Sequence, residues 1–331
     1  MNFQGLQRVE DAQTYLDTSF RAGREAVDNH RMQKEYRSQR SRIEKSKNIE
    51  LVRMSAIRAS LTKSLSRLLI SFPNTTELPV FYHELLKTTI DYYPFKKALA
   101  TCNWARERIN GFHEFYSKKL KGSREMSGIT RVRKEFFGRV SSIMYQLEKP
   151  LKFLEYSRKT MKEFPTIKTE TPTISLVGFP NIGKTTLLFK LTSSKPEISN
   201  YAFTTTKINV SYFKEKVGKK GEETEKKIQV LDTPGTLNRF DKMNMIEKQA
   251  YLAMKYCSDL FVYIFDLTEP FPIKDQEKLF RETKKFDKKM IVYLSKADIL
   301  PAEKIQEFAK KYNAIWDAEE LKQKIIDNLN L

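Results

Sequence analysis

One segment of the chain, Gly178-Phe-Pro-Asn-Ile-Gly183-Lys184-Thr185, fits the pattern G-x-x-x-x-G-K-[ST] at every fixed position. Glycines let such a loop curl so that its N–H groups point at phosphates. The lysine ammonium then reaches the β- and γ-phosphates, and the threonine hydroxyl is suited to hold Mg²⁺. We therefore expect a nucleoside-phosphate site with catalytic Lys184. The residues expected to contact the nucleotide here are Gly178, Asn181, Ile182, Gly183, Lys184, Thr185 and Thr186.

A second segment, Val230-Leu-Asp-Thr-Pro-Gly235, follows about 50 residues later. An acidic residue at the end of a strand beside a phosphate loop can hold Mg²⁺ through water, which is the role expected of Asp232. Gly235 can place its N–H near the γ-phosphate, so the loop after it would respond to the nucleotide state. A lone Asp-Thr-Pro-Gly is more often an ordinary turn, but this one follows a complete phosphate-loop motif.

A third segment, Ser295-Lys-Ala-Asp298, comes directly after an apolar run and matches [NT]-K-x-D except at its first position. The carboxylate of Asp298 is expected to accept hydrogen bonds from guanine, which adenine cannot offer in that geometry. The stem of Lys296 is expected to lie along the base. Ser295 stands where asparagine is usual, so we expect some of the tethering bonds to be lost and guanine affinity to be reduced.

Between the first two motifs lies Tyr201-Ala-Phe-Thr-Thr-Thr-Lys207. A threonine at this place in a nucleotide switch closes over Mg²⁺ and the γ-phosphate. Thr205 is the expected metal-binding and catalytic threonine, with Thr204 as the alternative. A β-prone threonine run that simply leads into a strand fits the composition equally well.

The elements that must position these motifs fall into two parts. Residues 1–165 show apolar residues at helical spacing and predict an all-helical bundle of four or five helices, with breaks at Pro73 and at Tyr92-Tyr93-Pro94, and a bend or interruption at Pro150. Residues 166–331 alternate short apolar runs with helical segments, which is typical of an α/β, doubly wound, mainly parallel sheet. The expected strands are 173–177, 207–213, 227–232, 260–266 and 290–294, with an exposed hairpin turn over 214–227.

The net charge of +19 is unevenly distributed. Residues 1–170 hold 33 Lys+Arg against 19 Asp+Glu, a net of +14, and the remainder carries +5. This excess favours a polyanionic partner such as RNA, although a surface that is merely lysine-rich is the competing interpretation. The candidate contacts are one stripe and one cluster: Arg21, Arg24, Arg31, Lys34, Arg37 and Arg40, and Arg131, Arg133, Lys134 and Arg139. Phe136 and Phe137, beside the cluster, are more readily explained as core.

The three motifs together with Phe203-Thr-Thr resemble the Obg-type GTPases, and the helical part resembles the nucleolar G-protein (Nog) family in its short, archaeal form. The stretches that carry the second resemblance are Asp17-Thr-Ser-Phe-Arg21, Phe72-Pro-Asn-Thr-Thr-Glu-Leu-Pro-Val-Phe-Tyr82, Trp104-Ala-Arg106 and Phe137-Gly-Arg-Val-Ser-Ser142. The resemblance implies a P-loop GTPase that converts GTP to GDP with Mg²⁺ and acts in assembly of the large ribosomal subunit. Its implied partners are ribosomal RNA, the subunit precursor and other assembly proteins.

Two departures bear on the rate and affinity. Thr236 and Leu237 stand where many GTPases carry a glutamine that orients water, so intrinsic hydrolysis should be slow. No Ser-Ala motif that backs the guanine is visible, and Asn313-Ala314 is the nearest candidate. Asn181 matches an asparagine that binds K⁺ in some relatives, so K⁺ stimulation is a hypothesis. An RNA-binding scaffold that binds GTP but hydrolyses it little, and a signalling GTPase, are the alternative functions.

Cysteine content and hydropathy limit the class of protein. Cys102 and Cys257 cannot build a disulfide framework, which favours a reducing compartment. The longest apolar run, 260–265, is far shorter than the roughly 20 residues of a membrane span. The first residues show no signal-peptide pattern. We expect a cytoplasmic protein.

Overall fold

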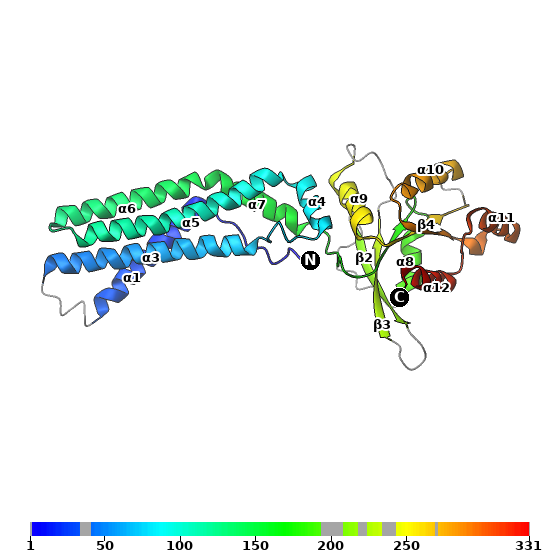
Figure 1. The fold of residues 1–331 in the computed structure, drawn as a ribbon, viewed down its shortest axis with the longest axis horizontal. Helices are drawn as coiled ribbons and strands as arrows, with labels where there is room; N and C mark the ends of the chain where they lie inside the picture. The colour runs from blue at the N-terminus through cyan, green and yellow to red at the C-terminus, as the bar shows by residue number, and fades with distance from the viewer. Residues whose placement is uncertain are drawn as a thin grey trace. The chain divides into compact units, whose positions relative to one another are not determined.

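The computed structural model describes residues 2–33, 41–192, 208–217, 224–233, 243–268 and 271–330 (Figure 1). The chain divides into two compact units. One comprises residues 3–77 and 90–163 and is helical; the other comprises residues 1–2, 78–89 and 164–331 and contains the sheet. The helical domain followed by a mostly parallel sheet with flanking helices confirms the predicted fold class. Residues 78–89 lie with the sheet, although the sequence places them among the helices.

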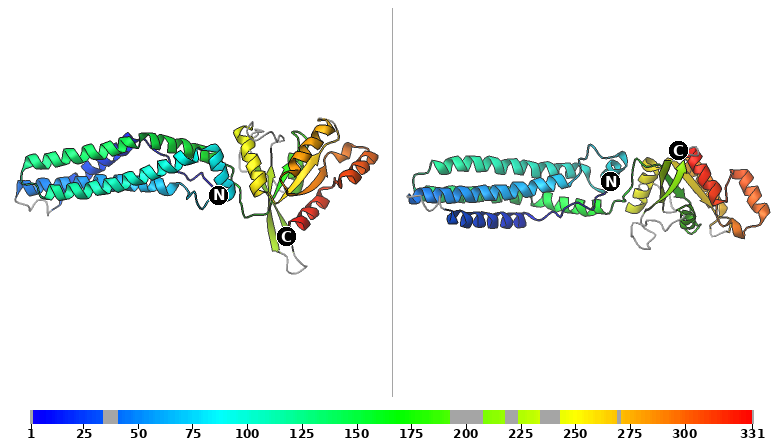
Figure 2. Two further views of the ribbon diagram at one scale, coloured as in Figure 1. Left: turned by 45° about the horizontal axis from the view of Figure 1, so that its top comes forward. Right: turned by 90° about the horizontal axis from the view of Figure 1, so that it is seen from below.

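The helical unit is built from five helices among its described residues (Figure 2). They are α1 (Ala12–Met32), α3 (Arg42–Ser71), α5 (Tyr92–Lys121), α6 (Met126–Gln146) and α7 (Glu148–Lys162). On α3, Met54, Ile57, Leu61 and Leu65 recur at spacings of three and four and are all at most 1% exposed. This stripe forms the centre of the bundle because helical residues at that spacing share one face.

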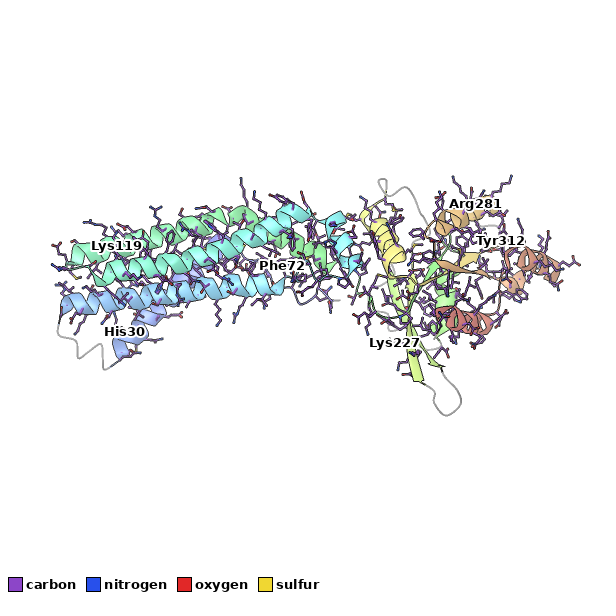
Figure 3. The ribbon with its side chains drawn as sticks, in the orientation of Figure 1. His30, Phe72, Lys119, Lys227, Arg281 and Tyr312 are labelled. Atoms are coloured by element: carbon purple, nitrogen blue, oxygen red, sulfur yellow. The ribbon has the colours of Figure 1, made fainter. Side chains whose placement is uncertain are left out.

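Polar contacts tie the helices of this unit together. Glu50 of α3 is buried and pairs with Arg53 at 2.8 Å and with Arg133 of α6 at 3.4 Å. Arg133 is therefore engaged in an ion pair with a buried residue of the bundle. Figure 3 labels Lys119 of α5, whose ammonium lies 2.6 Å from the carboxylate of Glu135 on α6. Phe136 is fully buried, as predicted for a core residue.

The ends of the helices show how proline acts on them. α3 ends at Ser71, two residues before Pro73, as predicted. The other two breaks lie just before their prolines rather than at them. Leu147 separates α6 from α7, so Pro150 stands in the first turn of α7, and α5 likewise begins at Tyr92 with Pro94 in its first turn. A first turn has no backbone partner for its N–H groups, so proline costs little there.

The sheet unit has the strand order β2-β3-β1-β4-β5. The strands are β1 (Thr173–Val177), β2 (Asn209–Val217), β3 (Thr224–Asp232), β4 (Leu260–Phe265) and β5 (Lys289–Leu294). β1 is parallel to β3 and β4, and β4 is parallel to β5. β2 is antiparallel to β3, and the pairing extends from Asn209–Asp232 to Val217–Thr224. The two strands therefore occupy much of the run predicted as a turn over 214–227.

Helices cover both faces of this sheet. They are α8 (Lys184–Thr192), α9 (Met245–Cys257), α10 (Ile273–Lys284), α11 (Ala302–Tyr312) and α12 (Ala318–Leu329). One buried cluster joins α8 and α12 to the sheet, and the other joins α9, α10 and α11. β1 and β4 are buried along their whole length, which explains why they appear in the sequence as unbroken apolar runs. Tyr312 of α11, labelled in Figure 3, donates a hydrogen bond to Glu277 of α10.

A short helix from the N-terminal half, α4 (Val80–Thr89), packs against α9 in the sheet unit. Tyr82 of α4 is fully buried, and its hydroxyl lies 3.0 Å from the carbonyl oxygen of Pro165, 2.9 Å from that of Ile167 and 2.8 Å from the backbone nitrogen of Ile167. The backbone of Lys168 in turn bonds the side chain of Gln229 on β3, its N–H donating to Oε1 at 3.0 Å. The start of the sheet unit is thus held between α4 and β3.

Among the described residues, no helix is both long and apolar enough to cross a membrane. Cys102 and Cys257 are free, buried thiols, and burial raises the pKa of each to about 12.

Candidate nucleotide site

The segment predicted to bind phosphate links the end of β1 to the start of α8. Gly178 has φ +152° and Gly183 has φ +94°, and Asn181 is left-handed at φ +61°. A Cβ on Gly178 would stand 2.3 Å from Cδ1 of Ile182 and 2.7 Å from the carbonyl oxygen of Ile264. Only glycine fits there. Ile182 is fully buried and anchors the loop in the core beneath α8, while Thr185 and Thr186 are exposed in the first turn of that helix.

Lys184 is buried at the mouth of this loop. Its ammonium donates to the carbonyl oxygens of Gly178 at 2.9 Å and Phe179 at 2.6 Å. Burial lowers the pKa of Lys184, and the nearby charge of Asp232 acts in the opposite direction. A buried ammonium whose bonds go to neutral carbonyl groups is well suited to meet an anion.

Asp232, the last residue of β3, lies beside Lys184 and Thr185. The Thr185 hydroxyl donates to Asp232 Oδ2 at 3.2 Å. The other carboxylate oxygen, Oδ1, is buried and has no hydrogen-bond partner among the residues that the structure describes. Burial raises the pKa of Asp232, while Lys184, Thr185 and Asn209 lower it. An unpartnered carboxylate oxygen next to a threonine hydroxyl is an oxygen donor set of the kind that Mg²⁺ takes, so these residues fit that ion.

The third motif lies next to the phosphate loop. A Cβ on Gly183 would stand 3.6 Å from Cβ of Ser295, which follows β5. Ser295 is buried, and its hydroxyl donates to the carbonyl oxygen of Phe265 at 2.9 Å. The serine therefore ties the end of β5 to the end of β4. Asp298 is exposed in a short 3₁₀ turn, η2 (Ala297–Ile299).

Lys296 is left-handed at φ +53°, and its ammonium lies 2.6 Å from a carboxylate oxygen of Asp266, whose side chain is fully buried. Asp266 follows β4, and its other oxygen accepts from the backbone and hydroxyl of Thr268 at 2.8 and 2.6 Å. Gln276 of α10 clamps the backbone of Asp266 from both sides, with bonds of 3.0 and 2.8 Å. This support of Lys296 is absent from the sequence prediction, although an acidic residue that ends a buried strand is a usable signal.

The candidate for the motif that backs the guanine, Asn313-Ala314, follows α11. Asn313 is left-handed and ends α11, and Ala314 is buried before the bridge between Ile315 and Tyr293. The pair thus lies directly before Ile315, which is bridged to the end of β5, the strand that leads into the third motif.

Some predicted residues lie outside the described residues. They are Thr205 and Gly235, the alternative Thr204, Thr236 and Leu237, and Lys34, Arg37 and Arg40 of the basic stripe.

Two family models match the chain. One, described as the NOG1 N-terminal helical domain, matches residues 3–168. The other, described as 50S ribosome-binding GTPase, matches residues 173–296. The two models meet between Lys168 and Thr173, directly before β1.

Relatives match across both units. An uncharacterized protein of Methanocaldococcus jannaschii is 34% identical over 266 residues, which cover 79% of this chain and 72% of that protein. Nucleolar GTP-binding protein 1 of Kluyveromyces lactis is 31% identical over 249 residues, which cover 74% of this chain but 38% of that protein. The chain thus spans less than two fifths of that eukaryotic relative. The crystal structure of the G domain of the FeoB iron transporter from T. maritima is 26% identical and covers 48% of this chain and 99% of its own, at a TM-score of 0.37.

Proposed function

The chain belongs to the NOG1 family of GTP-binding proteins, and on that premise we propose that it is a slow, Mg²⁺-dependent GTPase that switches its docking on the large ribosomal subunit during assembly. One observation carries this proposal. Lys184 and Asp232 are both buried beneath a glycine-rich loop at the end of a strand, and each keeps bonding capacity for a ligand. Buried charges of opposite sign at such a place are explained by a phosphate and its cation.

Each residue has a separate task in this mechanism. The N–H groups of the loop bind phosphate oxygens, and Lys184 exchanges its carbonyl bonds for phosphate oxygens and stabilises the charge that develops there. Thr185 and Asp232 would hold Mg²⁺, Asp232 through water, and the ion would supply charge neutralisation when bound. We assign Thr205 to the same ion and Gly235 to the γ-phosphate on sequence grounds.

Guanine selectivity is assigned to the loop after β5. Asp298 is exposed and has no hydrogen bond or ion pair within the described structure, so its carboxylate is available to the base. Lys296 is held by the buried Asp266, and its neighbour Ser295 lies beside Gly183 of the phosphate loop. The hydroxyl of Ser295 donates to the carbonyl oxygen of Phe265, and serine cannot form the additional hydrogen bonds that an asparagine amide would offer to the loop. We therefore expect guanine to bind more weakly than in a relative that carries asparagine at this position.

Ribosomal RNA is the proposed docking partner of the helical unit, with the subunit precursor and other assembly proteins around it in the cytoplasm. The net charge of +14 on residues 1–170 supports this. A phosphate-dominated interaction loses affinity steeply as salt rises, so a flat salt response would exclude it.

The first test measures affinity for GDP, GTP and ATP with and without Mg²⁺, and GTP turnover with and without purified large-subunit particles. Lys184→Ala should abolish turnover and weaken GTP binding by at least about a hundredfold, because it removes a buried charge-assisted contact. Lys190→Ala, on the exposed side of the same helix, is the matched control and should behave as the wild type.

The outcomes separate the candidate functions. Particle-stimulated turnover supports the switch. Guanine binding without turnover under any condition would favour the scaffold that binds GTP structurally. Turnover that is equal in K⁺ and Na⁺ would exclude a stimulatory cation at Asn181.

A further inference from the structure

Three large aromatic side chains are exposed along one helix of the helical unit. Tyr93, Trp104 and Phe115 of α5 are 73%, 44% and 59% exposed. They follow one another at intervals of 11 residues, which is three helical turns, so all three lie on one face at intervals of about 16 Å. α5 runs unbroken over this length (Figure 1). We call this row the aromatic face of α5.

The core of the bundle does not use this face. The buried residues of α5 recur on the other side of the helix: Phe95, Ala98, Cys102, Ala105, Ile109, Tyr116 and Leu120. Single exposed aromatics are common on protein surfaces, whereas these three are in register along a single helix. Phe115 is also held in place, since its ring meets that of the buried Tyr116 edge to face at 5.0 Å.

Each aromatic residue has a cation one turn further along the helix. Lys97 follows Tyr93 by four residues and Lys118 follows Phe115 by three, so these pairs are adjacent on the surface. Arg108 follows Trp104 by four, and its guanidinium lies over the ring of Phe112, 5.3 Å from the centroid. All three cations are exposed, and none has a carboxylate within ion-pair distance in the described structure.

The carboxylates of this face weaken the charge only in part. Glu107 is bound to Arg106 at 2.8 Å, and Glu114 is the acid of α5 that has no ion pair among the described residues. Small residues separate the aromatics, since Ala100 and Gly111 occupy the same face, and a Cβ on Gly111 would meet nothing within 4 Å. The backbone of α5 is therefore open to close approach between the rings.

We propose that the aromatic face of α5 binds single-stranded RNA, with an unpaired base stacked on each ring and the adjacent cation on a phosphate. The inference deepens the proposed docking on ribosomal RNA and rests on it. An aromatic ring paired with a basic side chain is the combination that single strands require. Paired bases present no free face, and an interval of about 16 Å far exceeds the 3.4 Å stacking distance, so the bases taken must be splayed apart.

Trp104 reports directly on this contact. The chain has two tryptophans, so Trp316→Phe leaves Trp104 as the sole source of indole fluorescence. A short mixed-sequence single-stranded oligoribonucleotide should quench that fluorescence saturably, and the blunt duplex of the same sequence should not. Tyr93→Ala, Trp104→Ala and Phe115→Ala should each weaken single-strand binding by about tenfold, the effect of losing one stacked base.

Tyr156→Ala is the control, because Tyr156 is 55% exposed on α7 and lies outside the row. GDP affinity and far-UV circular dichroism should be unchanged in all four variants, which shows that each is folded. Wild-type RNA affinity in the three aromatic variants would overturn the inference while leaving RNA docking intact. Failure of the wild type to bind any RNA at low salt would overturn the docking proposal as well. Quenching by ribosomal protein but not by deproteinised RNA would show a protein-binding face instead.

Discussion

At the scale of single residues, the burial of Asp232 and Lys184 makes the candidate nucleotide site sensitive to pH. Burial raises the pKa of the carboxyl and lowers that of the ammonium, so the fold opposes both charges until a ligand arrives. Between the ordinary pKa of an aspartate and the raised value, the folded chain holds more protons at Asp232 than the unfolded chain does. Raising the pH through that window therefore lowers the free energy of unfolding.

Asp232→Asn should separate stability from ligand binding. At pH 7 the nucleotide-free variant should be more stable than the wild type by about 1 kcal/mol, because the change removes a negative charge that burial disfavours. The gain should shrink toward pH 4, and Mg²⁺-dependent GTP affinity should fall. Urea unfolding at the two pH values and nucleotide titration measure this. Asp298→Asn is the control, since its exposed carboxylate should leave stability unchanged; a gain that does not depend on pH would contradict the account.

Gly178 tests the shape of the phosphate loop. Gly178→Ala places a Cβ against Ile182 and the carbonyl oxygen of Ile264 at a strained φ, so we expect a loss of about 2 kcal/mol or more in stability and loss of GDP binding. Gly138→Ala, within α6 where a Cβ meets nothing within 4 Å, should instead stabilise the chain by up to about 1 kcal/mol. Thermal unfolding and GDP titration of both variants decide the matter. Equal effects of the two changes would show that the close contacts at Gly178 are not limiting.

Residue types with fixed spacing explain what could be foreseen at this scale. Gly178, Lys184 and Asp232 could be proposed from the sequence because the chemistry of a phosphate loop prescribes such residues at set positions. The clamp of Gln276 on Asp266 could not be foreseen, because a buried glutamine ten residues away has no fixed pattern. Its geometry arises only when α10 packs on β4.

Among the elements, the helix α4 is bonded to residues 165 and 167 of the sheet unit through the hydroxyl of Tyr82. Tyr82→Phe removes the hydrogen bonds to the backbone at residues 165 and 167 and leaves those groups buried, so we expect a loss of about 1–3 kcal/mol. Tyr93→Phe, whose side chain is 73% exposed, should change stability by less than about 0.5 kcal/mol. Denaturant unfolding measures both. A loss no larger in Tyr82→Phe would show that the apolar face of α4 alone holds it.

Local rules predicted which elements exist better than where they pack. Strands β1, β4 and β5 are short apolar runs between polar segments, and their positions agree with the sequence prediction to within one residue. β2 and β3 extend further into the hairpin than predicted, because the charged residues that alternate along its arms resemble the polar composition of a turn. The place of α4 could not be predicted, since Phe81, Tyr82, Leu85 and Leu86 form an apolar stripe that would suit the bundle equally well.

At the scale of the whole molecule, ligand binding should reveal the two units. GDP with Mg²⁺ should stabilise the sheet unit by mass action, so we expect amide hydrogen exchange to slow in β1, β3 and β4 and, with them, in residues 80–89. Residues 92–162 should exchange at an unchanged rate. Mass spectrometry of peptic fragments measures the three regions separately. Exchange in α4 that follows residues 92–162 would place it with the bundle instead.

The position of α4 also has a consequence for the synthesis of the chain and for the choice of fragments. Synthesis delivers α4 before α9 exists, and residues 90–163 intervene between α4 and the strands that follow it. During that time its apolar stripe has no partner and is open to association with other chains. The match to the helical-domain model ends at residue 168. A fragment that ends there would contain α4 without α9, so the apolar stripe of α4 would stay without this partner.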